Sequence, residues 1–311
     1  MRYIGKKLLT LLATLLAVSF LSYAAFEMIG DPVATILGTN ATPEAAAQLR
    51  ADMGLDRPLP LRYGEWLWHF MGGDMGTSYI YRLPVREMIG EKLAVTLIMT
   101  LMAVILTVAV SVPAGAWLAR REGRPVDKVF TVLNQILMAV PPFFVAVLLT
   151  VVFGLLLRVF TPGRFVPYTE SWPLFLFYMI FPALSVALPR IAMTTKMLRA
   201  SALEELGRDY ILTAYSRGHS RRSALKAHAL KNAMLPVVTF LAANAAEMLA
   251  GGIVIEQLFS VPGIGRLLLS SIGTRDIPVV EAIVLILAVW VMLIHLIGDI
   301  LGQILDPRVR L

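Results

Sequence analysis

The feature that most restricts the fold is a series of long apolar runs with few charged residues. A run of about 20 such residues lets a helix cross the roughly 30 Å hydrocarbon core of a bilayer. Six runs meet this condition: Leu8–Phe26, Leu93–Ala119, Val129–Leu157, Leu174–Thr195, Pro236–Ile255 and Val279–Leu305. Only 16% of the 311 residues are charged, against about 25% in a typical soluble protein. We therefore predict an all-α integral membrane protein with six transmembrane helices.

The first run follows a basic start at Arg2, Lys6 and Lys7, which also fits a secretory signal peptide. Its apolar part is longer than the apolar region of a typical signal, and no small-residue cleavage site clearly ends it. We favour an uncleaved first helix over a cleaved signal.

Basic residues gather on one side of the predicted membrane. Six spans place both termini on the same side, together with the loops at 120–128 and 196–235. Most of the Lys and Arg residues lie in these four segments. Because cytoplasmic loops carry an excess of Lys and Arg, both termini are predicted to be cytoplasmic.

The segment 27–92 lies on the opposite, extracytoplasmic side in this arrangement. Thr42-Pro43-Glu44 has the pattern of a helix start, with a capping threonine followed by proline. The stretch 63–71 is rich in aromatic residues, as at a membrane interface. We interpret 27–92 as a small extracytoplasmic cap. The chain then divides into the first helix and cap (1–92) and a five-helix core (93–311).

The longest cytoplasmic loop, about 196–235, has the pattern of two short helices that meet at a glycine. The first covers Leu198–Arg217, and four apolar residues share one of its faces: Tyr210, Ile211, Ala214 and Tyr215. Gly218 suits the position after a helix end, because glycine enters the left-handed region at little cost. Ser220 can cap a second helix over 221–235. Two interpretations fit: the basic residues bind anionic lipid headgroups, or the segment docks onto a protein.

This loop resembles a known sequence. DYILTAYSRGHS at 209–220, followed by HALKNAMLP at 228–236, resembles the cytoplasmic EAA loop of permease subunits from binding-protein-dependent ABC importers. It is most similar to the dipeptide, oligopeptide and nickel branch, whose pattern is (E/D)YIxTAxxxGxS…HAL(R/K)NAxxP. Leu212 and Thr213 depart from the Glu-Ala of the broader importer pattern, and that branch shares the departure.

Further motifs extend the resemblance over nearly the whole chain. They are GDP at 30–32, MGLDRPLPLRYGEWL at 53–67, GDMGTSY at 73–79, VPPFF at 140–144, GGIVIEQLFSVPGIGRLLLSSI at 251–272, RDIPVVE at 275–281 and DPRVR at 306–310. Each motif is weak alone, but their shared order makes coincidence an inadequate explanation.

The resemblance implies a type I ABC importer permease fold in the bacterial cytoplasmic (inner) membrane. The expected partners are a second homologous permease in a heterodimer, two ABC ATPase subunits and an extracytoplasmic substrate-binding protein. The loop would couple the ATPases to the spans through Asp209, Tyr210, Thr213, Ala214, Arg217, Gly218, Ser220 and Arg221. Peptides are the first choice of substrate. Nickel or a metal-chelator complex is the alternative.

The residues also exclude several kinds of chemistry. No GxxxxGK[ST] sequence exists in the chain, so we expect ATP and Mg to bind to partner subunits and this chain to bind no cofactor. There is no cysteine, which excludes disulfides and thiolate catalysis. We also expect no metal site and no nucleic-acid partner.

The sequence lacks the features expected of two other classes of membrane protein. An ion-coupled secondary transporter is expected to have inverted repeats or discontinuous helices with paired acids, and no convincing internal repeat is found. An intramembrane enzyme would need a clustered set such as HExxH or paired aspartates within the spans, and the sequence has neither. We therefore expect a non-catalytic transporter subunit.

Charged residues within the spans are candidate functional residues, because burying them in a membrane is costly. Glu247 either lines the translocation path or pairs with a basic or hydroxyl group. Arg190 is interpreted as a packing or snorkelling charge, and His295 with Asp299 as a hydrogen-bonded pair. The segment EQLFSVPGIG at 256–265 is interpreted as a turn over the outer mouth. The residues proposed for the path or gate are Glu247, Asn244, Gly251, Glu256, Phe259 and Pro262.

Overall fold

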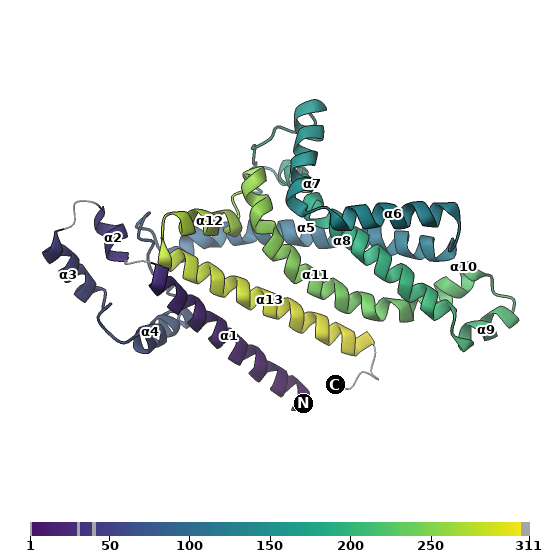
Figure 1. Cartoon of the computed structure of the whole chain (residues 1–311), viewed down its shortest axis with the longest axis horizontal. Coiled ribbons are helices and arrows are strands. Elements are labelled where there is room, and N and C mark those ends of the chain that lie inside the picture. Colours follow the sequence, from purple (N-terminus) through teal and green to yellow (C-terminus); the bar gives the residue numbers. More distant parts are fainter. Residues whose placement is uncertain (1, 30–31, 39–41, 306–311) are drawn as a thin grey trace. The chain divides into compact units, whose positions relative to one another are not determined.

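The computed structural model describes residues 2–29, 32–38 and 42–305, and these residues form helices joined by loops (Figure 1). The helices are α1 (Arg2–Ile29), α2 (Pro32–Leu37), α3 (Pro43–Asp52), α4 (Leu59–Met71), α5 (Val85–Arg120), α6 (Pro125–Ala139), α7 (Pro142–Leu149), α8 (Trp172–Leu206), α9 (Asp209–Ser216), α10 (Arg221–Ala224), α11 (Leu230–Phe259), α12 (Ile264–Gly273) and α13 (Ile277–Leu305). Two π-helical segments, η2 (Thr150–Leu156) and η3 (Leu225–Ala229), follow α7 and α10. Gly30 and Asp31 of the first motif and the DPRVR motif lie outside the described residues.

The predicted all-α membrane fold is confirmed. Among the described residues, five helices are long and apolar enough to cross a membrane: Leu9–Phe26, Val85–Arg120, Trp172–Leu206, Arg221–Phe259 and Ile277–Ile304. The count is six if the bent pair Pro125–Ala139 and Pro142–Leu156 forms one span. The chain is thus a multi-pass membrane protein whose helices extend well beyond several of the predicted runs.

The third span, predicted over 129–157, is not one straight helix. The helix breaks between α6 and α7 with a bend of 100°. Val140 is extended (φ −83°, ψ 122°) and is followed by Pro141 and Pro142. A proline lacks the N–H that a helix needs and disfavours helical geometry in the residue before it, so two in succession end α6.

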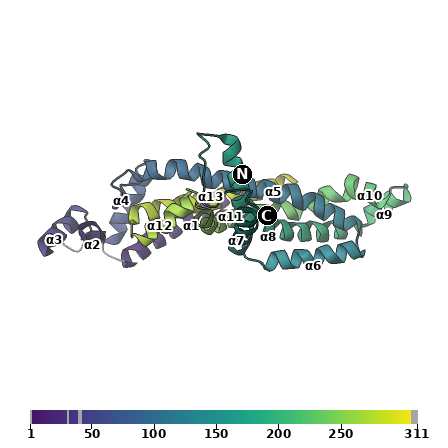
Figure 2. The ribbon, with the colours of Figure 1, turned by 90° about the horizontal axis from the view of Figure 1, so that it is seen from above.

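The described chain consists of two compact units. One contains Met1–Val95 and Pro262–Met292, and the other contains Thr96–Val261 and Leu293–Leu311. In the second unit, α8 packs against α6, α7 and α11, and Figures 1 and 2 show α6, α8 and α11 side by side. The predicted division into 1–92 and 93–311 remains a prediction.

In the first unit, the predicted start of α3 is confirmed: Thr42 is the N-cap, and its hydroxyl accepts a hydrogen bond from the Ala45 N–H (3.2 Å). Aromatic side chains join α4 to α1. Tyr63 of α4 packs edge-on against Phe20 of α1, with ring centroids 5.2 Å apart, and its hydroxyl lies 2.6 Å from that of Ser19. The aromatic stretch at 63–71 therefore fastens the predicted cap to the first span.

Candidate coupling site

The predicted corner between two helices exists at Gly218, which has a φ of +85°. Its N–H donates to the Tyr215 carbonyl (2.9 Å), and the His219 N–H donates to the Ala214 carbonyl (3.1 Å). These two bonds form a Schellman motif, which ends α9 and needs a left-handed residue after the C-cap. Glycine occupies that position because it carries no Cβ.

The predicted cap at Ser220 is also confirmed. Its hydroxyl accepts a hydrogen bond from the Ser223 N–H (3.3 Å) at the start of α10. His219 Nδ1 lies 2.8 Å from the Ser223 hydroxyl. The turn between α9 and α10 is therefore fixed from both sides, as an ordered corner.

The predicted helix boundaries around the corner need two corrections. The first helix is not continuous over 198–217, because Gly207 caps α8 and Arg208 is extended (φ −77°, ψ 151°) before α9 begins. The second helix does not stop at 235, because α11 continues through Pro236. Ala233 and Val237, on either side of this proline, are buried in the core described next, and their packing holds the helix together there.

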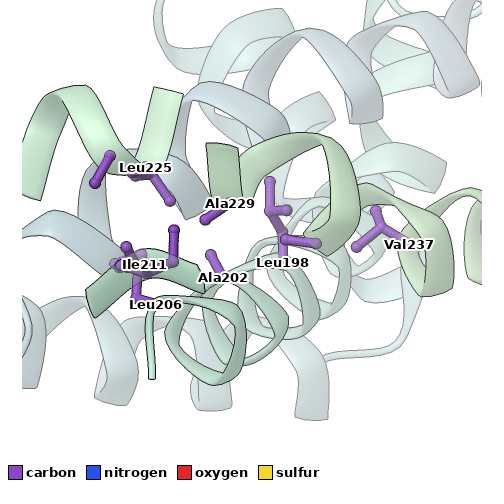
Figure 3. Packing of buried hydrophobic residues seen from close by; sticks show 10 residues of the cluster. Leu198, Ala202, Leu206, Ile211, Leu225, Ala229 and Val237 are labelled. Atoms are coloured by element: carbon purple, nitrogen blue, oxygen red, sulfur yellow. The ribbon is translucent and has the colours of Figure 1, made fainter. Parts of the chain in front are cut away.

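The corner rests on a core of its own chain (Figure 3). The buried residues are Ala119, Leu198, Ala202, Leu206, Ile211, Ala224, Leu225, Ala229, Ala233 and Val237. They come from α5, α8, α9, α10, η3 and α11. The break at Arg208 gives α9 its own direction, and Leu206 before it and Ile211 after it are both buried in this core.

The predicted apolar face of α9 points mostly inward, and a coupling role for Tyr210 and Ala214 remains a prediction. Ile211 and Ala214 are buried, and Tyr215 packs partly against the same core. Burial of apolar area stabilises α9 on the chain itself. The exposed face carries Leu212, with 57% of its area accessible, and Arg217.

Tyr210 joins three helices through its hydroxyl. The hydroxyl donates to Glu205 Oε2 on α8 (2.5 Å) and accepts from Asn232 Nδ2 on α11 (3.1 Å). Burial and the bond to Glu205 raise the pKa of the Tyr210 hydroxyl, so it keeps its proton and remains a donor. Part of the ring is exposed beside Asp209 in the first turn of α9.

Arg221 ties the corner to a second cytoplasmic loop in the predicted topology. Its Nη2 donates to the Ala119 carbonyl (3.1 Å) and to Glu122 Oε2 (2.6 Å). Arg221 and Glu122 are both substantially exposed, so the pair adds little stability by itself. It orients α10 against the end of α5.

An ion pair between α6 and α8 was not predicted from the sequence. Arg199 Nε and Nη2 each lie 2.6 Å from a carboxylate oxygen of Asp127, and the Gly123 N–H donates to the same carboxylate (3.0 Å). Such a two-bond guanidinium–carboxylate pair is both strong and directional. One signal was available: Asp127 is an acid within a basic loop.

Glu247 has a basic partner, as one of the two sequence alternatives expected. Its carboxylate lies 2.5 Å from Arg190 Nη1, which also donates to Asn244 Oδ1 (2.9 Å). The Arg190 side chain is 19% exposed and that of Glu247 is 62% exposed. The pair therefore joins α8 to α11 while the acid faces outward from its own unit. Arg190 is a partner of Glu247 and not simply a snorkelling charge.

The other residues proposed for a path or gate have different surroundings. Glu256 is fully buried and accepts a hydrogen bond from the Thr96 hydroxyl (2.5 Å). Phe259 is buried near Phe160. Gly251 is partly exposed, whereas Pro262 belongs to the first unit. In this structure Glu256 and Phe259 are thus packing residues of the chain, and a role for all of these residues in a path remains a prediction.

Two family models match nearly the whole chain. Residues 111–311 match the family described as the binding-protein-dependent transport system inner membrane component. Residues 1–100 match the N-terminal region of binding-protein-dependent transport system membrane components.

Individual relatives cover nearly the full length. A Brucella abortus (strain 2308) protein named as a peptide transport system permease is 35% identical over 306 residues, which is 98% of each chain. A Sinorhizobium fredii protein named as a peptide ABC transporter permease is 31% identical over 309 residues, or 99% of each. The dipeptide transport system permease protein DppB of Escherichia coli K12 is 34% identical over 336 residues, covering 100% of this chain and 99% of its own.

The helical membrane fold, the glycine corner between α9 and α10 and these full-length matches agree with one another. The family is one of transport systems that also comprise ATPase and substrate-binding subunits. The chain therefore belongs to the family of inner membrane permease components of binding-protein-dependent ABC transport systems.

Proposed function

We propose that this chain is the permease subunit of an ATP-driven importer that takes up di- or oligopeptides. The substrate follows from the names of its relatives, which are described as peptide or dipeptide permeases. A binding protein delivers the peptide on the extracytoplasmic side, and a second, homologous permease completes a heterodimeric pathway. Both termini are then cytoplasmic.

In this proposal the chain is not an enzyme and binds no cofactor. ATP and Mg bind to two ATPase subunits, which close on ATP binding and move the corner at Gly218. The corner is joined to α8 through Tyr210 and to α5 through Arg221. Motion at the corner therefore reaches the spans through direct hydrogen bonds and a shared core.

The observation that carries the proposal is the outward face of α9. Its inward residues pack into the core, yet Leu212 and Arg217 are both exposed at the protein's predicted cytoplasmic end. An exposed leucine beside basic side chains suits a protein cleft with an apolar floor and an acidic rim. Asp209, Thr213 and Ser220 are also exposed, and Gly218 lets a partner approach the backbone closely.

A surface double variant, Leu212→Asp with Arg217→Glu, tests this proposal without removing any core residue. We expect loss of ATPase co-purification and of uptake of a radiolabelled dipeptide. Leu61→Asp is the matched control, because Leu61 is similarly exposed but lies on α4. It should leave ATPase co-purification unchanged.

Retention of both ATPase binding and uptake in the double variant would overturn the coupling role of this surface. Substrate is tested separately in cells that lack other peptide importers. Uptake of ⁶³Ni instead of the dipeptide would replace the peptide assignment with nickel and leave the coupling role intact.

A further inference from the structure

The first unit contains a cavity of about 350 Å³ that the coupling role does not use. Its walls come from α1, α4, the loop after α4 and the start of α13. Small-molecule sites occupy roughly 300–1,000 Å³, so this volume suits a small ligand or a single headgroup. Most of the lining is apolar, and it includes Met75 and Pro278.

One acidic group faces this apolar cavity. The Glu281 side chain lines it and is 8% exposed. Among the described residues, no hydrogen bond or ion pair reaches the Glu281 carboxylate. Burying a carboxylate that no group bonds costs several kcal/mol. The charge of Arg62 acts on Glu281 from the same lining, and an ammonium group in contact with the carboxylate would lower this cost further.

The cavity also has the aromatic walls that favour a cation. Tyr23, Trp66 and Tyr79 line it beside Glu281. Aromatic faces attract an ammonium group, and the attraction grows when water is excluded. Arg62 also lines the cavity, and its Nε donates to the Arg57 carbonyl (3.0 Å). The cavity therefore carries both an acidic and a basic side chain, which suits a zwitterion.

The loop that forms one wall is held in place in advance. The Ser78 hydroxyl donates to Asp276 Oδ2 (2.5 Å), and the Tyr79 N–H donates to Asp276 Oδ1 (2.9 Å). Ser78 and Asp276 are both buried. A site whose wall is fixed before binding loses less conformational freedom when a ligand enters. The arrangement of the loop is thus that of a preformed site.

We propose that this cavity binds a small zwitterion, with its ammonium group against Glu281 and the aromatic walls and its anionic group toward Arg62. Two molecules carry this chemistry: a short peptide with a free N-terminus and the headgroup of phosphatidylethanolamine. The proposal does not depend on the transport function, because binding is measured on the purified full-length chain.

The experiment compares the wild-type chain with Glu281→Gln, which keeps the shape of the side chain and removes its charge. Glu87→Gln is the control, since Glu87 is exposed on α5 outside the cavity. Trp66→Leu is a second variant that removes an aromatic wall. Each protein is placed in phosphatidylglycerol nanodiscs and titrated with the dipeptide Ala-Phe and with N-acetyl-Ala-Phe. A parallel preparation contains phosphatidylethanolamine, and native mass spectrometry counts the lipids retained.

For a peptide ligand, Ala-Phe binds the wild type and the Glu87→Gln control, its acetylated form does not, and Glu281→Gln weakens binding about tenfold or more. For a lipid ligand, phosphatidylethanolamine stays bound to the wild type and is lost in Glu281→Gln, while Ala-Phe does not bind. Trp66→Leu should weaken the binding of whichever ligand the wild type binds. Equal behaviour of the wild type and Glu281→Gln toward both probes would overturn the proposal.

Discussion

Gly218 controls the coupling corner through one backbone angle. At a φ of +85° it places its own N–H and that of His219 on carbonyls of α9. Other residues reach this region at a cost of roughly 1–2 kcal/mol, and proline cannot reach it at all. Apart from its two chain neighbours, no described residue places a heavy atom within 4 Å of the position a Cβ would take at Gly218, so the constraint comes from the backbone and not from crowding.

Gly218→Pro should uncouple transport while the spans still insert. The ring fixes φ near −65° and removes the N–H that bonds to Tyr215. Expected results are normal membrane levels, reduced ATPase co-purification and lost dipeptide uptake. Gly218→Asn is the control, because asparagine tolerates the left-handed region, and it should retain most uptake. Equal loss in both variants would show that the glycine matters for another reason.

Tyr210 offers a graded test of the link between α9 and its neighbours. Tyr210→Phe keeps the ring and loses the bonds to Glu205 and Asn232. This loss should weaken the attachment of α9 to its neighbours by about 1 kcal/mol. Tyr210→Asp instead sets a second carboxylate beside Glu205 and should abolish coupling through repulsion. The ratio of peptide uptake to ATP hydrolysis in proteoliposomes measures both. An unchanged ratio in Tyr210→Asp would contradict this role.

The helices themselves were largely predictable from the sequence, but their breaks and contacts were not. Apolar runs predicted where the spans lie, because length and composition decide whether a helix can cross a membrane. To predict the bend between α6 and α7, the helix-ending effect of Pro141 and Pro142 had to be given more weight than the apolar run around them. The end of α8 at Leu206 has a local signal in Gly207, but the packing of Leu206 and Ile211 in the core is not contained in a single run of sequence.

The ion pair between α6 and α8 should matter more for stability than surface pairs do. Asp127 is buried and bonds Arg199 at two positions. Asp127→Asn leaves a partly buried guanidinium without its charge partner and should lower the free energy of unfolding by about 2–3 kcal/mol. Thermal unfolding in detergent measures this loss.

Glu204→Gln is the comparison for that measurement. Glu204 also pairs with an arginine, Arg208, but both side chains are more than half exposed. Exposed pairs contribute little, so the unfolding temperature should hardly change. Equal shifts in the two variants would mean that the pair between α6 and α8 does not hold these helices together.

At the scale of the whole molecule, the absence of cysteine allows a direct test of topology. In the proposed arrangement, the corner at Ser216 faces the cytoplasm and Trp68 faces the opposite side. Trp68→Cys should react with a membrane-impermeant maleimide in spheroplasts, which lack the outer membrane barrier. Ser216→Cys should react only after the inner membrane is permeabilised, and labelling of both from outside would contradict the orientation.

The candidate site was predictable only where its chemistry is local. Gly218 and Ser220 could be assigned because a turn and a cap depend on neighbouring residues. The partners of Arg190 and Arg221 could not be, since Glu247 and Glu122 are distant in sequence and meet them only through the packing of helices. The inward direction of Ala214 also depends on that packing.

The helix that leaves the corner has a mechanical consequence. Arg221–Phe259 continues over 39 residues, which is about 58 Å at 1.5 Å per residue and about twice the thickness of the hydrocarbon core. A rod of this length works as a lever, in which a tilt of about 10° at one end displaces the other by roughly 10 Å. In the proposed importer, the length of this helix determines how far a small movement of the ATPase subunits displaces the far end of the helix, and so how widely the pathway opens.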